Sequence, residues 1–160
     1  MPSMPSMPSL RTRLAAFAGP LAAAVAGGSA TDPGSTWFRR LAKPPWYPPP
    51  QTFGIVWTGL YAGLGWAAGE VRVAADPQRR TGFDRAYRLN LLLNAAWTPV
   101  FFRAHRPWLA AAESAALTVS TVDLARRAAA VRPGAAAALV PYAAWTAFAT
   151  ALTVSIARRN

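Results

Sequence analysis

Residues 54–69 read Gly54-Ile-Val-Trp-Thr-Gly-Leu-Tyr-Ala-Gly-Leu-Gly-Trp-Ala-Ala-Gly69 and carry no charged side chain. At about 100° per residue, an α-helix over this stretch places Trp57 and Tyr61 within about 40° of each other. Gly59 and Gly63 then fall roughly on the opposite side, at a spacing that lets a second helix approach closely. The stretch therefore predicts an apolar helix with an aromatic face and a packing face. Packing within one subunit and dimerisation both explain the glycines.

The composition of the whole chain agrees with a membrane protein. Of its 160 residues 53% are hydrophobic and 14% charged, whereas a soluble domain usually carries about 25% charged residues. The net charge of +11 alone would suggest a nucleic-acid partner, but the basic residues lie in clusters between long apolar runs and not over one face. The absence of cysteine excludes a disulfide framework and a cysteine nucleophile. We expect an all-α integral membrane protein with no nucleic-acid partner.

Five apolar stretches approach the roughly 20 residues that cross a bilayer. They are residues 14–30, 53–73, 87–102, 108–125 and 135–156. They predict one multi-pass domain over residues 10–160, a bundle of five transmembrane helices with a Pro/Trp-rich first loop at residues 31–52. Ten basic residues fall on the amino-terminal side of these spans and seven on the other. The positive-inside rule favours a cytoplasmic amino terminus, and the small difference leaves the orientation open.

The amino terminus has two interpretations. Residues 1–9 are three copies of Met-Pro-Ser, which proline keeps from continuing a helix, so we predict a disordered leader. Residues 10–30 also resemble a cleavable signal peptide, with Arg11 and Arg13 as its charged region. The apolar part of 17 residues exceeds the ~7 to 15 typical of such signals, which favours a membrane span.

The loop between the first two spans is rich in proline and aromatic residues. Its six prolines impose a stiff, extended path, and Lys43, the only lysine of the chain, directly precedes the densest run. One interpretation is an interfacial loop whose aromatic rings lie at the lipid headgroups. The other, which we prefer, is a lid over a binding site. The lid residues would be Trp37, Lys43, Pro44 and Pro45.

Two further spans each carry an aromatic and polar stripe. In the third, Asn90, Asn94 and Trp97 follow at helical spacing within about 60°. Carboxamides avoid lipid, so these two hydrogen-bond neighbouring helices or line a polar part of a cavity. In the fifth span Tyr142 and Trp145 begin a comparable stripe. Together with the aromatic face of residues 54–69, three helices direct such stripes toward a common interior.

Few residues suggest conventional catalysis. Glu113 lies within the fourth span, where an acid needs a partner or water, and an interhelical hydrogen bond is the simplest role. His105 lies in the turn after the third span, which favours a solvated loop residue over a metal or haem ligand. The sequence contains no Gly-rich phosphate loop and no paired carboxylates. We expect no metal site, and enzymatic activity stays open.

Four motifs, in order along most of the chain, resemble the TspO/MBR family of tryptophan-rich sensory proteins and translocator proteins (peripheral-type benzodiazepine receptors). They are Trp37-Phe38 with Leu41-Ala-Lys-Pro-Pro-Trp46, Trp57-Thr-Gly-Leu-Tyr61, Asn90-Leu-Leu-Leu-Asn94-Ala-Ala-Trp97-Thr-Pro-Val-Phe-Phe102, and Leu139-Val-Pro-Tyr142-Ala-Ala-Trp145-Thr-Ala-Phe148-Ala-Thr-Ala-Leu152. The chain departs from the family at Asn90, where many members have glutamine, and at Thr153, where asparagine is usual.

The resemblance implies a five-helix membrane bundle, commonly a homodimer, whose pocket is closed by the first loop. Such pockets bind porphyrins (protoporphyrin IX, haem) and isoquinoline-type ligands, with a role in tetrapyrrole sensing, transport or light-dependent degradation. Trp57 and Trp145 would be the pair associated with that photochemistry. No cofactor is obligatory, because porphyrin or haem enters as the ligand. Sterol binding is not expected, since no basic residue follows Tyr142 until Arg158.

A flat apolar macrocycle would bury its faces on indole rings while a few polar groups orient it. The predicted ligand-binding residues are Trp46, Trp57, Tyr61, Asn90, Asn94, Trp97, Tyr142, Trp145 and Phe148. The expected location is a bacterial cell membrane. Two alternatives stay open: a small transporter of other apolar compounds, which would usually show intramembrane charge or repeats, and a membrane assembly or scaffold protein without a ligand.

Overall fold

A computed structural model describes residues 7–160, and over this range the chain contains helices and connections but no strand. The helices are Met7–Ala15 (α1), Ala18–Ala30 (α2), Thr36–Arg40 (α3), Pro50–Ala74 (α4), Pro77–Phe102 (α5), Pro107–Ala129 (α6) and Pro133–Ala157 (α7). The all-α prediction is confirmed. Of the predicted leader, residues 1–6 lie outside the described residues, and residues 7–9 form the first turn of α1.

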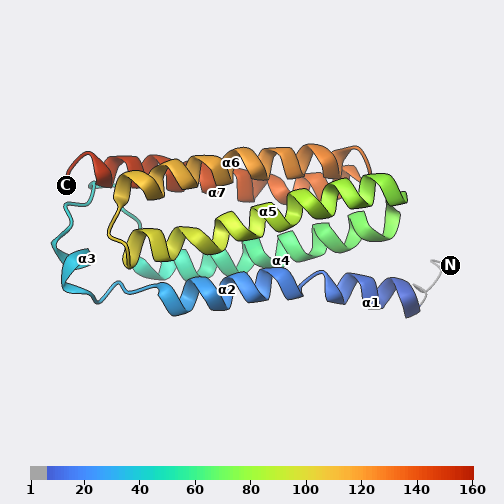
Figure 1. Cartoon of the computed structure of the whole chain (residues 1–160), viewed down its shortest axis with the longest axis horizontal. Helices are drawn as coiled ribbons and strands as arrows, with labels where there is room; N and C mark the ends of the chain where they lie inside the picture. Colours follow the sequence, from blue (N-terminus) through green and yellow to red (C-terminus); the bar gives the residue numbers. More distant parts are fainter. Residues whose placement is uncertain (1–6) are drawn as a thin grey trace.

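The long helices lie side by side as an elongated bundle (Figure 1). Helix α6 packs against α7 and α5, α2 packs against α5, and α4 packs against α7, while α1 continues the line of α2 after a break at residues 16–17. We call the end with the α4–α5 and α6–α7 connections (residues 75–76 and 130–132) the arginine end. The opposite end, with residues 31–49 and 103–106, is the loop end.

Proline marks the start of each long helix. Pro50, Pro77, Pro107 and Pro133 occupy the first turns of α4 to α7, where a missing N–H costs nothing because that N–H has no helical partner. The α5 helix begins ten residues before the apolar stretch at residue 87. Hydropathy did not predict these ten residues because many of them are charged. They are helical because the Asp76 side chain caps the helix, accepting hydrogen bonds from the backbone N–H groups of residues 78 and 79.

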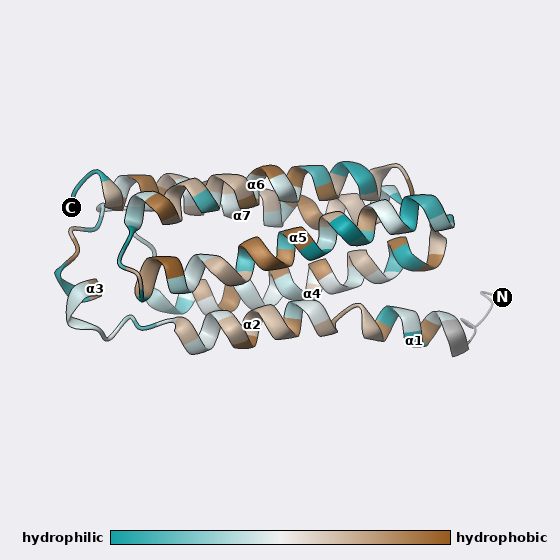
Figure 2. Ribbon diagram, in the orientation of Figure 1, coloured by the Kyte–Doolittle hydropathy of each residue, from teal (hydrophilic) through white to brown (hydrophobic). Residues whose placement is uncertain are grey.

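Within residues 7–160 one helix, Pro133–Ala157, is long and apolar enough to cross a membrane on length and composition alone. The first predicted span is split between α1 and α2, and the glycines and aromatic residues of α4 lower its hydropathy. The count of five spans therefore stays a prediction. Apolar residues nevertheless occur along all the long helices (Figure 2). Some of them are exposed: Val25 on α2, Ile55 on α4 and Val119 on α6 are 73%, 75% and 71% exposed.

The glycines of α4 pack mainly inside the chain. A Cβ at Gly65 would lie 2.5 Å from the ring of Phe17, and one at Gly69 would lie 3.0 Å from the Cα of Arg13. The missing side chains of these two glycines therefore let the amino-terminal segment pack closely against α4. A Cβ at Gly63 would lie 3.4 Å from a backbone oxygen of α7, whereas one at Gly59 would meet no atom within 4 Å. The predicted packing face is thus occupied at Gly63 and open at Gly59.

Candidate functional site

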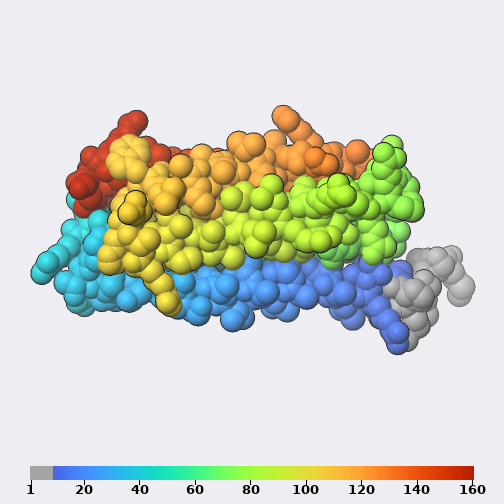
Figure 3. Space-filling view, viewed as in Figure 1, coloured from blue at the N-terminus to red at the C-terminus, as the bar shows by residue number. Residues whose placement is uncertain are grey.

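A cavity of about 780 Å³ lies inside the loop end of the bundle. This volume is within the ~300 to 1,000 Å³ of ordinary small-molecule sites. Its aromatic lining comes from the loop and from α3, α4, α5 and α7. The residues are Phe38, Tyr47, Phe53, Trp57, Tyr61, Trp97, Phe101, Phe102 and Trp145. In the space-filling view the loop (cyan) and the carboxyl terminus (red) form the left end of the molecule (Figure 3).

The structure brings six of the sequence-predicted site and lid residues to the cavity wall. They are Lys43, Trp57, Tyr61, Asn94, Trp97 and Trp145. Asn90 and Tyr142 are fully buried behind the wall, 0% and 1% exposed. Trp46 and Phe148 pair with each other outside the lining, with ring centroids 5.8 Å apart. The remaining lid residues, Trp37, Pro44 and Pro45, belong to the loop but do not line the cavity.

The two asparagines of α5 take part in a chain of hydrogen bonds that joins four helices. The Tyr61 hydroxyl donates to Asn94 Oδ1 at 2.8 Å, and Asn94 Nδ2 donates to the Tyr142 hydroxyl at 3.0 Å. That hydroxyl donates to Asn90 Oδ1 at 3.1 Å, and Asn90 Nδ2 donates to Thr121 Oγ1 at 3.0 Å. The sequence left two roles open for these carboxamides, hydrogen bonding to other helices and lining a cavity. Both asparagines hydrogen-bond other helices, and Asn94 also lines the cavity.

Two indole N–H groups at the cavity are unsatisfied. The Nε1 atoms of Trp97 and Trp145 are buried and have no hydrogen-bond partner among the described residues, although both residues line the cavity. A buried donor without an acceptor costs about 1 to 3 kcal/mol. Because indole nitrogen can only donate, two of the lining residues carry donors that lack an acceptor, although neither donor atom is itself exposed at the cavity surface.

The aromatic rings form two groups around the cavity: one joins Trp57 to Tyr61 and Tyr142, and the other runs by successive ring contacts from Trp97 to Trp145. Trp57 stacks on Tyr61 with centroids 5.3 Å apart, and Trp97 stacks on Phe101 at 5.0 Å with an interplanar angle of 8°. Trp145 lies edge-on to Phe53 at 5.8 Å. Each indole is thus held by a neighbouring ring. Among the described residues no ring contact joins Trp57 directly to Trp145.

The loop is fastened to the bundle from two sides. Trp37 stacks on His105 of the α5–α6 turn at 4.3 Å, and it lies edge-on to Phe101 of α5 at 5.3 Å. Asn160, beyond the end of α7, accepts from the backbone N–H of Ala42 at 2.9 Å and donates to its carbonyl at 3.2 Å. His105 is exposed, as predicted for a loop residue, but its ring helps to hold the loop.

Lys43 and Tyr47 stabilise the loop itself at the cavity wall. The Lys43 ammonium donates to the Phe38 carbonyl at 2.7 Å and lies 4.3 Å from the centroid of the Phe38 ring. A cation there suits the carboxyl end of α3. Burial raises the pKa of the Tyr47 phenol above its ordinary value, so this side chain is neutral at physiological pH. The single lysine thus has a structural partner in the loop.

Sequence reasoning missed part of the wall. Gly27 and Gly28 of α2, and Ser114, Thr146 and Thr153 of α6 and α7, also line the cavity. The sequence prediction relied on aromatic and carboxamide residues at helical spacing, so it did not identify these small and hydroxyl side chains. The pair of adjacent glycines was the one available signal, since it leaves room beside a helix.

Glu113 is not part of the cavity wall. Both of its carboxylate oxygens are buried and have no hydrogen-bond partner among the described residues, so the interhelical hydrogen bond predicted for it is not found there. Within residues 7–160, no three histidine, aspartate or glutamate side chains lie close enough together to hold a metal ion. The residues that line the cavity offer aromatic rings for stacking and polar groups for hydrogen bonding.

Comparison with known proteins agrees with this geometry. The sequence model of the TspO/MBR family matches residues 16–159. The Homo sapiens protein named Translocator protein is 35% identical over 136 residues, covering 79% of this chain and 76% of that protein. The Chlorobaculum tepidum Tryptophan-rich protein TspO is 30% identical over 151 residues, covering 88% and 90%. Protein CrtK of Rhodobacter capsulatus is 29% identical over 150 residues, covering 87% of each.

Proposed function

This chain belongs to the TspO/MBR family of membrane proteins, and on that premise we propose that it binds porphyrins and related flat, apolar ligands in the loop-end cavity. Protoporphyrin IX and haem are the ligands that the family resemblance suggests. The observation that carries the proposal is an aromatic cavity of about 780 Å³ whose lining residues include Trp97 and Trp145, two indoles without an acceptor.

The chemistry of a porphyrin fits these features. Its macrocycle is flat and largely apolar, so it gains by lying against aromatic rings such as that of Trp57. Its carboxylates accept hydrogen bonds, and a bond from an indole N–H to a charged acceptor is stronger than one to a neutral acceptor. The hydrogen-bonded pair of Tyr61 and Asn94 gives the wall a fixed polar point that orients the ligand.

The proposal includes a membrane arrangement. We assign α1 with α2 as one pass and α4 to α7 as the other four, because these helices lie side by side in one bundle (Figure 1). The larger number of basic residues belongs to the arginine end, so the positive-inside rule favours a cytoplasmic location for that end. For the homodimer that the resemblance implies, we assign the outer side of α4 at Gly59, where an added Cβ meets no atom within 4 Å.

A titration of the detergent-purified protein with protoporphyrin IX, followed by porphyrin absorbance and tryptophan fluorescence, tests the binding. We expect saturable binding by the wild type and roughly tenfold weaker binding by each of Trp97→Phe and Trp145→Phe, the loss of about 1.4 kcal/mol expected for one hydrogen bond. Trp66→Phe is the matched control, because Trp66 is 46% exposed on α4 and does not line the cavity. Equal affinities in all four proteins would contradict the proposal.

Light-dependent breakdown of the bound porphyrin is a second candidate, favoured by the position of Trp57 and Trp145 in the wall of the same cavity. The photochemistry would belong to the porphyrin and dioxygen, while the protein orients the ring and excludes water. Irradiating the complex in air and under argon tests this. Loss of absorbance in air that is slower in Trp145→Phe supports it, and decay equal to that of free porphyrin leaves the protein a binder.

A further inference from the structure

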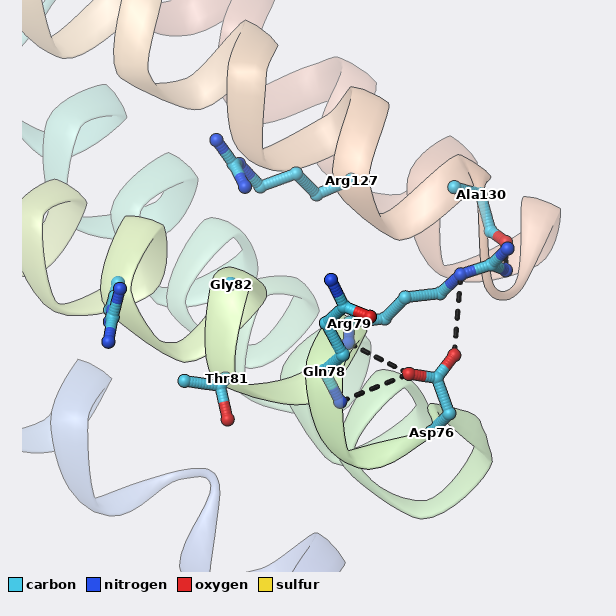
Figure 4. Close-up of a pocket in the computed structure, with 8 residues that line it drawn as sticks. Asp76, Gln78, Arg79, Thr81, Gly82, Arg127 and Ala130 are labelled. Atoms are coloured by element: carbon cyan, nitrogen blue, oxygen red, sulfur yellow. Dashed lines mark hydrogen bonds and ion pairs between the residues drawn. The ribbon is translucent and has the colours of Figure 1, made fainter.

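A second cavity, of about 980 Å³, lies at the arginine end, which is the end opposite the loop in Figure 1; Figure 4 shows the residues that line it. It opens between the first turns of α5 and the last turns of α6. Three guanidinium groups line it, those of Arg79, Arg85 and Arg127. We call it the arginine groove. The porphyrin-binding proposal makes no use of it.

The single acid in the lining of the groove is already occupied. Asp76 accepts from the backbone N–H groups of Gln78 at 3.1 Å and Arg79 at 3.0 Å, and it pairs with the Arg79 side chain at 3.3 Å. Arg127 pairs through Nε with Asp123 at 2.7 Å. Arg85 has no ion-pair partner among residues 7–160. The groove therefore keeps an excess of positive charge that only an external anion neutralises.

The walls of the groove are held in position before any ligand arrives. Arg79 Nη1 donates to the carbonyl of Ala130 at 2.8 Å, which joins α5 to the end of α6. A Cβ added at Gly82 would lie 3.3 Å from Arg127 Nη1, so the guanidinium of α6 lies close against α5 at its glycine. Fixed donors lose less conformational entropy on binding than free side chains do.

From the groove toward the middle of the bundle, the exposed side chains of α5 and α6 include large apolar residues. On α5, Leu89 and Leu92 lie four and seven residues after Arg85, on the same side of the helix and about 6 and 10 Å along its axis. They are 54% and 69% exposed. On α6, Val119 lies two turns before Arg127 and is 71% exposed. The groove thus joins a cationic site to an exposed apolar strip that runs toward the middle of the bundle.

We propose that the arginine groove binds the phosphodiester headgroup of an anionic phospholipid, with the acyl chains lying along the exposed apolar side chains of α5 and α6. Guanidinium groups match phosphate oxygens in charge and hydrogen-bond geometry. Basic pockets between helices at the membrane surface are suited to anionic headgroups. A free phosphate would use only the arginines, whereas a lipid uses both the arginines and the leucine strip.

Lipid retention in the purified full chain tests the assignment. The protein, in micelles doped equally with phosphatidylglycerol and phosphatidylcholine, is analysed by native mass spectrometry. The wild type is expected to retain phosphatidylglycerol in preference to phosphatidylcholine. Arg85→Gln should lower that preference about fivefold, the effect of one basic residue near a membrane surface. Because Arg85 has no internal partner, the substitution leaves the fold intact, which size-exclusion elution verifies.

Arg88→Gln is the matched control. Arg88 lies on the same helix, is exposed and does not line the groove, so the variant removes the same charge and should keep the wild-type preference. An equal loss in both variants would show a general charge effect and overturn the groove as the site. Equal retention of the two lipids by the wild type would overturn the proposal itself.

A second readout separates lipid from free anion. Phosphatidylglycerol should raise the unfolding temperature of the wild type, and the same concentration of inorganic phosphate should not, because phosphate makes no contact with Leu89 and Leu92. If inorganic phosphate stabilises the protein as much as phosphatidylglycerol does, the groove is an anion site and the lipid assignment is wrong.

Discussion

The two ends of the bundle are stabilised in different ways. Among residues 7–160, every ion pair lies in the half of the molecule toward the arginine end, including two contacts to Glu70, from Arg13 at 2.7 Å and from Arg132 at 3.5 Å. The loop end has instead an aromatic cavity with unsatisfied donors. The ion pairs of Glu70 and the pair of Arg72 with Asp84 join different helices at the arginine end, whereas two indoles at the loop end have no partner. Stability and binding are therefore expected to respond to different mutations.

A large loss of stability is expected from Glu70→Gln. The Glu70 side chain is 11% exposed and joins α4 to α1 and to the start of α7, and its loss leaves Arg13 partly buried and unpaired. Breaking a buried pair costs about 3 to 5 kcal/mol, and partial exposure of Arg13 lowers the expectation to about 2 kcal/mol. Thermal unfolding in detergent measures this.

The control for Glu70→Gln is Asp123→Asn, which breaks a pair whose two side chains are 46% and 48% exposed. Exposed pairs contribute about 0 to 1 kcal/mol, so its unfolding temperature should hardly change. Neither variant should alter porphyrin affinity. A large loss of affinity in Glu70→Gln with unchanged unfolding would show that the two ends are not separate.

The two asparagines of the hydrogen-bond chain allow the effect on stability to be separated from the effect on porphyrin binding within α5. Asn90→Ala and Asn94→Ala each leave buried polar partners unsatisfied and should cost about 1 to 3 kcal/mol of unfolding free energy. Only Asn94 lines the cavity, so only Asn94→Ala should also weaken protoporphyrin binding, as measured by absorbance titration. Equal affinity losses in the two variants would place Asn90 in the ligand site as well.

Two glycines of α4 distinguish internal packing from assembly. Gly63→Leu inserts a side chain where a Cβ already lies 3.4 Å from the backbone of α7, and such overpacking costs about 1 to 3 kcal/mol. Gly59→Leu meets no atom of its own chain and should leave the unfolding temperature unchanged while shifting size-exclusion elution toward the monomer. A destabilised Gly59→Leu variant would reverse this assignment.

The smallest expected effect concerns the attachment of the loop. Asn160→Ala removes two exposed hydrogen bonds to Ala42, together worth about 1 kcal/mol. Porphyrin dissociation, followed by stopped-flow fluorescence, should become about fivefold faster, while the unfolding temperature stays near that of the wild type. Ser155→Ala is the control, because the Ser155 hydroxyl lies on the last turns of α7 and accepts from Arg159 rather than from the loop. Unchanged dissociation in Asn160→Ala would show that this attachment does not limit ligand exit.

The sequence predicted the helical class and the family because its signals are local. The four tryptophan-rich motifs and the apolar runs locate α4, α6 and α7 to within a few residues. The start of α5 escaped prediction because its first turns are charged, and their stability comes from the Asp76 cap and from Pro77. Hydropathy measures transfer to lipid and not helix formation, so it could not find that boundary.

The aromatic residues of the site could be predicted from the sequence, but the long-range contacts that hold the loop and the helices in place could not. Trp57, Tyr61 and Trp97 follow helical spacing, so their shared interior face could be derived. The contact between Ala42 and Asn160 joins residues 118 positions apart, and the pairing of Arg13 with Glu70 depends on how α1 packs on α4. No local pattern encodes such contacts, so neither the fastening of the loop nor the ion pairs of Glu70 could be foreseen.

The most direct test of the central claim is an experimental structure of the protein bound to protoporphyrin IX. The macrocycle is expected in the loop-end cavity, against the ring of Trp57 and beneath the loop. A ligand carboxylate should lie within about 2.7 to 3.2 Å of the Nε1 atom of Trp97 or Trp145. A porphyrin found on the outer surface of the helices, with both indole donors still without an acceptor, would contradict it.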